Sequence, residues 1–411
     1  MHNLFYIKFE FVLLFCVCYI IFLHLCMKYA INGLLFVVLL SSCYKNNEPG
    51  AEIFSFTPGK GAEGNAVTIR GAQFGDSPDK IRVYFNGVPS SMDSFSDTLL
   101  VVKVPGGATT GKIAISKAGK TDVSEEDFVI FPGHWIQMSN LPSGFAARGL
   151  AAGFAIDTIG YFGMGYASSG LKNDMMAFDP ASNIWTPRAA SPGSPIQSPV
   201  SMVIGNYAYI GIGKTENLPA SPEFWQYDPA ADSWTRKADL PDTVSEGAFG
   251  VGFGDKGYVG IIPHMSGKKA WWEYDPANNT WTSNADFPGT AMDWPCGFAL
   301  HGKIYIGLSS LQAPHEWWQY DPAMNQWKRM NDFPGSLAFA GSGFVIGDKG
   351  YVAGGECWQY NDQSDSWAQM AFINRSGGST FSIRDKGYYV GGGNLSTQNF
   401  FPEIWEFTPP K

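Results

Sequence analysis

Charged residues and cysteines are scarce in this 411-residue chain, and both shortages limit what the protein can be. Charged side chains make up 16% of the residues, and the formal net charge is −9. Such an acidic chain lacks the basic surface that binds a phosphate backbone, so we expect no nucleic-acid partner. Beyond residue 42 the cysteines are Cys43, Cys296 and Cys357. They make neither a disulfide framework nor a zinc spacing, and only a Cys296–Cys357 bridge stays open.

Motifs for catalysis and for cofactors are also missing. The chain contains no H-E-x-x-H, G-x-S-x-G or C-x-x-C segment. The four histidines beyond residue 42 are too scattered to predict a metal site. The segment GIGKT (211–215) resembles a phosphate-binding loop, but Ala208 stands where that loop needs its first glycine, so we expect a turn. The sequence therefore predicts no cofactor and no metal.

Residues 1–42 have the features of an export leader. The two apolar runs within them are each too short to cross a membrane as one helix. From Met27 onward, a lysine, an apolar run and small residues form a secretory signal that ends at Cys43. The ending Leu-Ser-Ser-Cys resembles a bacterial lipobox, which implies that Cys43 is diacylated and becomes the new amino terminus.

We therefore expect translation to start at Met27, with residues 43–50 as a short polar tether. The alternative is a transmembrane anchor formed by both apolar runs together. Either interpretation puts the folded part outside the cytoplasm. The lipobox resemblance implies a lipoprotein of the cell envelope, at the outer membrane, held by its acyl chains.

Residues 51–131 predict a small antiparallel sandwich. Strand-like runs such as NAVTIRG, KIRVYFNG and GKIAIS alternate with turn residues at short spacing. The phrases FTPGKGAEGNAVTIRGAQFG and VPGGATTGKIAIS resemble an IPT/TIG domain, which implies an immunoglobulin-like fold. Nothing in this segment suggests catalysis.

Residues 134–411 repeat one unit of four strands, which we name a, b, c and d in chain order. Strand b carries a central aromatic residue, strand c ends in Tyr-Asp-Pro or a variant of it, and strand d begins at a tryptophan. The five complete copies of the turn place that tryptophan at Trp185, Trp234, Trp281, Trp327 and Trp367. Four strands per repeat at this spacing are typical of a β-propeller blade.

The sixth repeat is divided between the two ends of the region. His134–Met138 contains a tryptophan without Tyr-Asp-Pro before it, whereas Ile404–Pro410 has the strand c pattern without a tryptophan after it. Pairing these segments predicts a six-bladed propeller that is closed by its own termini and has no open edge. The repeats resemble kelch repeats, which generally serve as binding platforms. The predicted class is thus all-β, an immunoglobulin-like sandwich followed by a propeller.

Strand a of each blade should line the central channel. Counting back 11 to 13 residues from the strand b tyrosine therefore predicts a set of channel residues that bind a ligand: Arg148, Gln197, Glu246, Asp293, Trp294 and Arg375. The loops between strands b and c share that face and add rim candidates: His264, Lys268, Lys269, His315, Glu316, Asn394 and Gln398. The alternative is that such inner polar groups pair with one another or hold water.

Three functions agree with these features. The first is a membrane-anchored extracytoplasmic protein whose propeller binds a carbohydrate or a protein, with Trp294 as a stacking surface for a sugar. The second is an enzyme, because some six-bladed kelch proteins resemble sialic acid epimerases or mutarotases. In that case Glu246 or Asp293 is the base, and Arg148 or Arg375 binds the substrate carboxylate. The third is a structural envelope protein without a small ligand.

Overall fold

The computed structural model describes residues 49–217, 220–242, 247–261, 269–290, 294–308, 315–335, 341–373, 375–394 and 397–410. Strands dominate these residues, and the short 3-10 helix η2 (Pro78–Lys80) is their one helical element. Across the same residues no helix has the length and apolar character needed to span a bilayer. Cys43 and the export leader lie outside the described residues.

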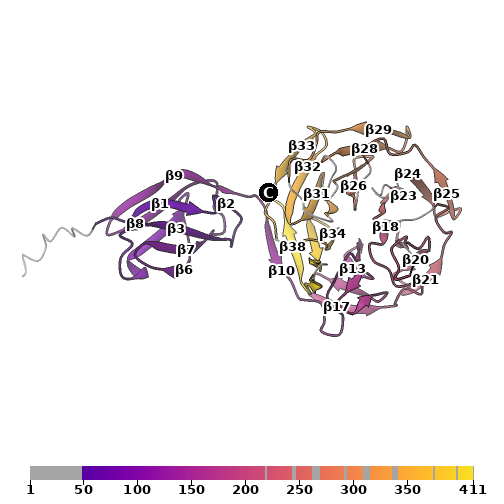
Figure 1. The fold of residues 1–411 in the computed structure, drawn as a ribbon, viewed down its shortest axis with the longest axis horizontal. Coiled ribbons are helices and arrows are strands. Elements are labelled where there is room, and N and C mark those ends of the chain that lie inside the picture. Colours follow the sequence, from indigo (N-terminus) through magenta and orange to yellow (C-terminus); the bar gives the residue numbers. More distant parts are fainter. Residues whose placement is uncertain are drawn as a thin grey trace, which may run out of the picture.

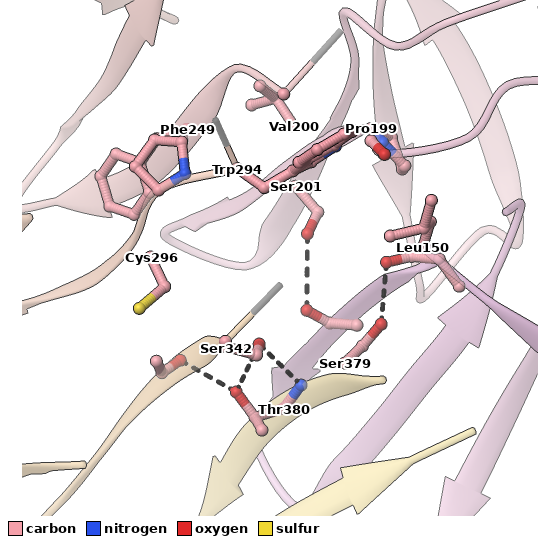
Figure 2. A pocket seen from close by; sticks show the side chains of 18 of the residues that line it. Leu150, Pro199, Val200, Ser201, Phe249, Trp294, Cys296, Ser342, Ser379 and Thr380 are labelled. Atoms are coloured by element: carbon pink, nitrogen blue, oxygen red, sulfur yellow. Dashed lines mark hydrogen bonds between the residues drawn. The ribbon is translucent and has the colours of Figure 1, made fainter. Parts of the chain in front are cut away.

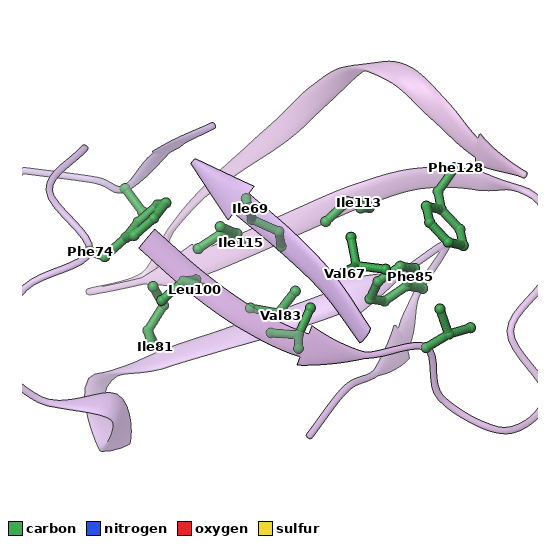
Figure 3. Close-up of a cluster of buried hydrophobic side chains, with 13 residues drawn as sticks. Val67, Ile69, Phe74, Ile81, Val83, Phe85, Leu100, Ile113, Ile115 and Phe128 are labelled. Carbon is green, nitrogen blue, oxygen red and sulfur yellow. The ribbon is translucent and has the colours of Figure 1, made fainter. Parts of the chain in front are cut away.

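The amino-terminal domain is the predicted sandwich of two sheets. One sheet has the order β1 (Glu52–Thr57), β3 (Ala66–Ala72), β7 (Leu99–Lys103), β6 (Met92–Phe95). The other has the order β2 (Lys60–Gly61), β9 (Lys120–Ile130), β8 (Gly111–Lys117), β4 (Ile81–Phe85), β5 (Val88–Pro89). Alternate residues such as Val67 and Ile69 on β3 point inward, and the Phe85 and Phe128 rings meet edge to face at 5.0 Å (Figure 3).

The rest of the chain forms six four-stranded antiparallel sheets around an axis, as predicted (Figure 1). From the axis outward, blades 1 to 3 are β12 (Ala152–Ile156), β13 (Ile159–Gly163), β16 (Met175–Asp179), β17 (Ile184–Arg188); β18 (Val200–Ile204), β19 (Tyr207–Gly211), β20 (Phe224–Asp228), β21 (Ser233–Arg236); and β22 (Phe249–Phe253), β23 (Lys256–Ile261), β24 (Ala270–Asp275), β25 (Thr280–Ser283).

Blades 4 to 6 are β26 (Cys296–Leu300), β27 (Lys303–Gly307), β28 (Trp317–Asp321), β29 (Gln326–Arg329); β30 (Ser342–Ile346), β31 (Lys349–Gly354), β32 (Glu356–Asn361), β33 (Ser366–Gln369); and β34 (Ser379–Ile383), β35 (Lys386–Val390), β38 (Ile404–Thr408), β10 (His134–Gln137). The innermost strands β12, β18, β22, β26, β30 and β34 contact one another in a closed cycle. The ring is therefore complete.

Blade 6 is built from both ends of the propeller. Its outermost strand β10 pairs antiparallel with β38, and the register places Trp135 opposite Phe407 and Ile136 opposite Glu406. The Trp135 and Phe407 rings are 4.9 Å apart. The predicted closure of the ring by its own termini is thus confirmed, and it removes the open sheet edges that a linear array would expose.

Aromatic pairs fill the space between neighbouring blades. The tyrosine at the centre of each strand b packs against the aromatic residue near the end of strand c in the next blade, with ring centroids 5.3 to 6.2 Å apart. The six pairs, in order, are Tyr161–Tyr227, Tyr209–Tyr274, Tyr258–Tyr320, Tyr305–Tyr360, Tyr351–Phe407 and Tyr388–Phe178. The last pair joins blade 6 to blade 1, so the packing runs around the whole ring.

The side chains of strand c differ in burial from one residue to the next. In the Trp-Trp pairs of blades 3 and 4, Trp271 and Trp317 are fully buried, but Trp272 and Trp318 are only partly buried. Two adjacent tryptophans on a strand between two blades predict that both rings are buried, and this prediction is wrong for the second ring of each pair. Trp318 instead donates its indole N–H to Glu316 Oε2 at 2.8 Å and lies beneath the Arg329 guanidinium, 5.3 Å from the ring centre.

The turn between strands c and d has the predicted chemistry. The Asp275 Oδ1 accepts a hydrogen bond of 2.9 Å from the Ala277 N–H, and the equivalent bond occurs in the other four complete repeats. Two residues before the tryptophan, each of these turns carries Asn or Asp in the left-handed region, at φ between 47° and 57°. These residues are Asn183, Asp232, Asn279, Asn325 and Asp365. Asn and Asp tolerate that conformation better than other non-glycine residues.

The same turn clamps the preceding blade, and we call this arrangement the blade clamp. In blade 3, Asn279 Oδ1 accepts from the Ala238 N–H at 2.9 Å, while the Trp281 indole N–H donates to the Ala238 carbonyl at 2.9 Å. Both backbone groups of one residue are thus held by one turn. The clamp recurs on three other residues that follow a strand d: Ser139, Ala189 and Ala285.

Replacing Asn279 with Ala should lower the free energy of unfolding by about 2 kcal/mol, because it removes the bonds to Tyr274 and Ala238 and holds an alanine at positive φ. Urea unfolding followed by tryptophan fluorescence measures this change. The control is Asn279→Asp, since Asp232 fills the equivalent place in blade 2; its cost should stay within about 0.5 kcal/mol. Equal stability of wild type and Asn279→Ala would contradict the clamp.

Candidate functional site

The first residues of the six inner strands, with the loops leading into them, surround a cavity of about 190 Å³ on the propeller axis. Small residues, hydroxyls and two aromatic rings line it (Figure 2). The lining residues are Leu150, Ala151, Gly153, Ser198, Pro199, Val200, Ser201, Gly247, Ala248, Phe249, Gly250, Trp294, Pro295, Cys296, Gly297, Gly341, Ser342, Gly343, Gly377, Gly378, Ser379 and Thr380. We call this cavity the channel mouth.

Glycines allow the blades to converge there. A Cβ on Gly343 would lie 2.2 Å from the Gly297 carbonyl oxygen of the neighbouring inner strand, and one on Gly250 would lie 2.2 Å from a Val200 methyl group. Neither position has room for a side chain. The approach of the inner strands that forms the channel mouth therefore depends on glycine.

A left-handed residue precedes five of the six inner strands by two positions, and the corresponding position before β30 lies outside the described residues. Leu150, Ser198, Gly247, Trp294 and Gly377 have φ between 49° and 89°. The Leu150 N–H donates to the Gly377 carbonyl at 2.9 Å, and the Ser198 N–H donates to the Leu150 carbonyl at 2.8 Å. Blades 6, 1 and 2 are thereby linked edge to edge at the channel mouth. The conformation is costly for the non-glycine members, and such positions tend to gather at functional sites.

Hydroxyl groups in the channel mouth join neighbouring inner strands. Thr380 Oγ1 bonds to Ser342 Oγ at 2.7 Å and donates to the Gly343 carbonyl at 3.0 Å (Figure 2). Ser379 Oγ donates to the Ala151 carbonyl at 2.8 Å, and Ser201 Oγ donates to the Gly153 carbonyl at 3.4 Å. These bonds agree in part with the alternative prediction, in which inner polar groups pair with one another.

Three lining residues remain available to a ligand in different ways. The Ser198 hydroxyl is buried and has no hydrogen-bond partner among the described residues, so it can donate to a bound group and accept from it. Trp294 and Phe249 add aromatic surface to the same cavity (Figure 2). Trp294 is thus a predicted site residue that the structure places in the channel mouth.

Cys296 also lines the cavity, but its thiol is 3% exposed, and burial raises its pKa to about 12. The group is therefore protonated at neutral pH and is a poor nucleophile. Cys296 and Cys357 are both free, so the bridge that the sequence left open does not form.

Arg148 does not face the channel mouth, contrary to expectation. Its side chain is fully buried, and its guanidinium forms an ion pair with Asp174, with Nη2 3.1 Å from Oδ2. Further N–H groups donate to the carbonyls of Ala146 and Met164, and the Phe145 ring lies 3.8 Å away. This arginine is held inside blade 1 and has no surface left for a ligand.

Arg375 and Gln197 also lie outside the cavity lining. Arg375 donates through Nε and Nη2 to Glu403 Oε2, both at 2.9 Å, and covers the Phe401 ring at 4.2 Å. Gln197 forms two backbone hydrogen bonds with Lys214, each of 3.0 Å. Glu246 and Asp293 lie outside the described residues, so their binding roles stay predictions. Of the four predicted residues that the structure describes, Trp294 alone lines the cavity.

Two rim candidates lie together beside blades 1 and 6. The small sheets β11 (Arg148–Gly149), β14 (Tyr166–Ala167), β15 (Gly170–Leu171) and β36 (Gly393–Asn394), β37 (Asn399–Phe400) form there. They include Asn394, and Gln398 adjoins β37. Gln398 Nε2 donates to the Tyr166 hydroxyl at 3.1 Å, and the Tyr166 and Phe400 rings are 5.9 Å apart.

Other rim candidates serve the fold. Glu316 is 6% exposed and accepts from the Thr290 backbone N–H and from Trp318. Burial raises the pKa of Glu316, but these hydrogen bonds and Arg329 outweigh it and bring the pKa below its usual range. His315 Nδ1 lies 3.2 Å from the Phe333 carbonyl oxygen.

The remaining rim candidates are Lys269, His264 and Lys268. The Lys269 carbonyl accepts a hydrogen bond from the Phe287 N–H at 2.8 Å. His264 and Lys268 lie outside the described residues. Over the described residues, no group of three or more His, Cys, Asp or Glu side chains is placed to hold a metal ion.

Counting back from the strand b tyrosine selected residues that lie just before the channel lining in the sequence. Arg148, Gln197 and Arg375 each lie one or two positions before the first lining residue of their blade, Leu150, Ser198 and Gly377. The signal that marks the true lining is the left-handed residue followed by small residues, but Gly, Ser and Ala are common everywhere in this chain. Because the prediction favoured large polar residues, it selected residues before the left-handed residue and not the small residues after it.

Comparison with known proteins agrees with this architecture. Residues 51–127 match the family model of the IPT/TIG domain, so the amino-terminal sandwich is an IPT/TIG domain, as its motifs indicated. The solved structure of YjhT superposes with a TM-score of 0.54 at 14% sequence identity, covering 65% of this chain and 95% of YjhT. At that identity the similarity concerns the fold alone. The search of curated proteins gave no match.

Removing the Asp174 carboxylate should make the propeller less stable, because the buried Arg148 guanidinium then keeps only neutral partners. Asp174→Ala is expected to cost about 3 kcal/mol in the free energy of unfolding. The control is Asp239→Ala, which breaks the exposed pair with Arg236 and should cost less than about 1 kcal/mol. Equal costs in denaturant titrations would show that the Arg148 pair is no stronger than a surface pair.

Proposed function

We propose that this protein is an extracytoplasmic binding protein whose propeller takes a carbohydrate at the channel mouth. The observation that carries the proposal is the cavity itself: six inner strands converge on hydroxyls, backbone groups and two aromatic rings, one of them Trp294. Hydroxyl groups suit the hydroxyls of a sugar, and an aromatic face suits its C–H groups. The volume of about 190 Å³ fits a small ring or one end of a longer glycan.

The remaining parts of the proposal rest on the sequence. The lipobox at Cys43 supports acylation and attachment to a membrane, at the outer membrane in a periplasmic or surface-exposed position. The repeat pattern supports kelch-type blades, which are binding platforms in general. The IPT/TIG domain then stands between anchor and propeller. Its last residues pack directly on the ring, because Phe131 contacts Phe372 at 5.7 Å and the Ala371 N–H donates to the Pro132 carbonyl.

The ion pairs of two arginines favour the binding role over a sialic acid epimerase or mutarotase. That enzyme needs a cation for the substrate carboxylate, and the two candidates, Arg148 and Arg375, already pair with Asp174 and Glu403. Its candidate general bases, Glu246 and Asp293, lie outside the described residues and stay predictions. The fold shared with YjhT agrees with either function. A protein ligand on the same face, or a purely structural role, is the outcome if no sugar binds.

Isothermal titration of the full-length protein in detergent against a glycan panel tests the proposal. We expect at least one sugar to bind, and Trp294→Ala to weaken it about tenfold through the lost aromatic contact. Trp294→Phe should keep most of the affinity. The control Tyr207→Ala removes an exposed aromatic residue outside the cavity lining and should leave the affinity unchanged.

Absence of heat with every sugar would end the carbohydrate proposal and leave protein ligands or a structural role. NMR observation of anomeric exchange separates binding from catalysis. For the binding role, the exchange rate of a bound sugar, and that of sialic acid, stays at its uncatalysed value when the protein is added. Faster exchange would favour the enzyme.

A further inference from the structure

The described lining of the channel mouth carries no charged side chain. Its polar groups are the hydroxyls of serine and threonine, backbone amides and carbonyls, and the thiol of Cys296, which is uncharged at neutral pH. Such a lining limits the charge that a ligand can carry into the cavity.

The described arginines nearest in the sequence to the cavity lining do not reach it. Arg148 and Arg375 precede the lining residues of blades 1 and 6, are paired with carboxylates and lie outside the lining. An anionic ligand therefore meets no compensating charge from these two arginines.

The hydroxyls of the lining also have a defined polarity. Ser379, Thr380 and Ser201 each give their proton to a backbone carbonyl of a neighbouring inner strand, at 2.8, 3.0 and 3.4 Å. A hydroxyl that has donated its proton keeps lone pairs, so it can only accept from a ligand. These three hydroxyls thus present acceptors, which suit a ligand that brings donors.

From these observations we infer that the channel mouth selects an uncharged saccharide and rejects acidic sugars such as uronates and sialates. A sugar hydroxyl donates to the acceptor oxygens, whereas a carboxylate is acceptor-only and meets them with like polarity. Moving a carboxylate out of water without a cation or enough donors is costly. The inference rests on the proposed function, because it names the ligand class of that same site.

Matched pairs of sugars test the inference on the wild-type, full-length protein in detergent. Methyl β-glucoside and methyl β-glucuronide differ only at C6, where a CH₂OH group replaces a carboxylate, and methyl galactoside and its uronide form a second pair. N-acetylglucosamine and N-acetylneuraminate extend the comparison. In whichever pair binds, titration calorimetry should give a neutral sugar at least about tenfold tighter than its acidic partner.

Salt provides an independent readout. The Kd of the neutral sugar should change by less than about twofold between about 50 and about 500 mM NaCl, because no charge pair forms that salt can screen. Acidic sugars that bind as tightly as their neutral partners, or a Kd that rises steeply with salt, would overturn the inference and leave the proposed function standing. If neither member of any pair binds, the proposed function fails, and the ligand class fails with it.

Discussion

The blade clamp is the interaction on which this propeller depends. A four-stranded sheet has two apolar faces and is stable only between two neighbours. In this chain one turn fixes the neighbour, because its Asn or Asp accepts the N–H of a residue such as Ala238 and its tryptophan donates to the carbonyl of the same residue. Holding the N–H and the carbonyl of one residue sets where each blade lies on the next. Four such clamps and two modified junctions, filled by the aromatic pairs, bring the inner strands together and create the channel mouth.

The junctions between blades are not all alike, and the junction at the closing blade differs because the two ends of the propeller meet there. Asp365 holds the Asn331 N–H, but among the described residues the buried Trp367 indole has no hydrogen-bond partner. At the closing blade, the Trp135 indole donates to the Ala371 carbonyl at 2.8 Å, and the Pro132 carbonyl accepts from the Ala371 N–H. No turn precedes Trp135, so the linker from the IPT/TIG domain supplies the missing acceptor. That domain is thereby part of the ring closure.

Much of the fold could be predicted from the sequence, because repetition multiplies a weak signal. One Tyr-Asp-Pro turn means little, but three of them and two variants in register, with a divided sixth copy, specify the blades and the β10–β38 pairing. The left-handed Asn279 position was not recognised, since a single asparagine in a turn has many explanations. The site was harder to predict. Arg148 looks like a ligand residue by type and position, but only the fold shows that Asp174 neutralises it, and glycines and serines such as Ser379 carry no distinctive signal.

The central claim is that the two ends of the propeller close it as adjacent strands of one blade. A double variant, Ile136→Cys with Glu406→Cys, tests it directly, because these residues lie opposite each other on β10 and β38 and facing positions suit a disulfide. Mild oxidation should give an intramolecular disulfide in the folded protein and raise its Tm. Cysteines that remain reduced, or that link only between molecules, would contradict closure and with it the channel mouth.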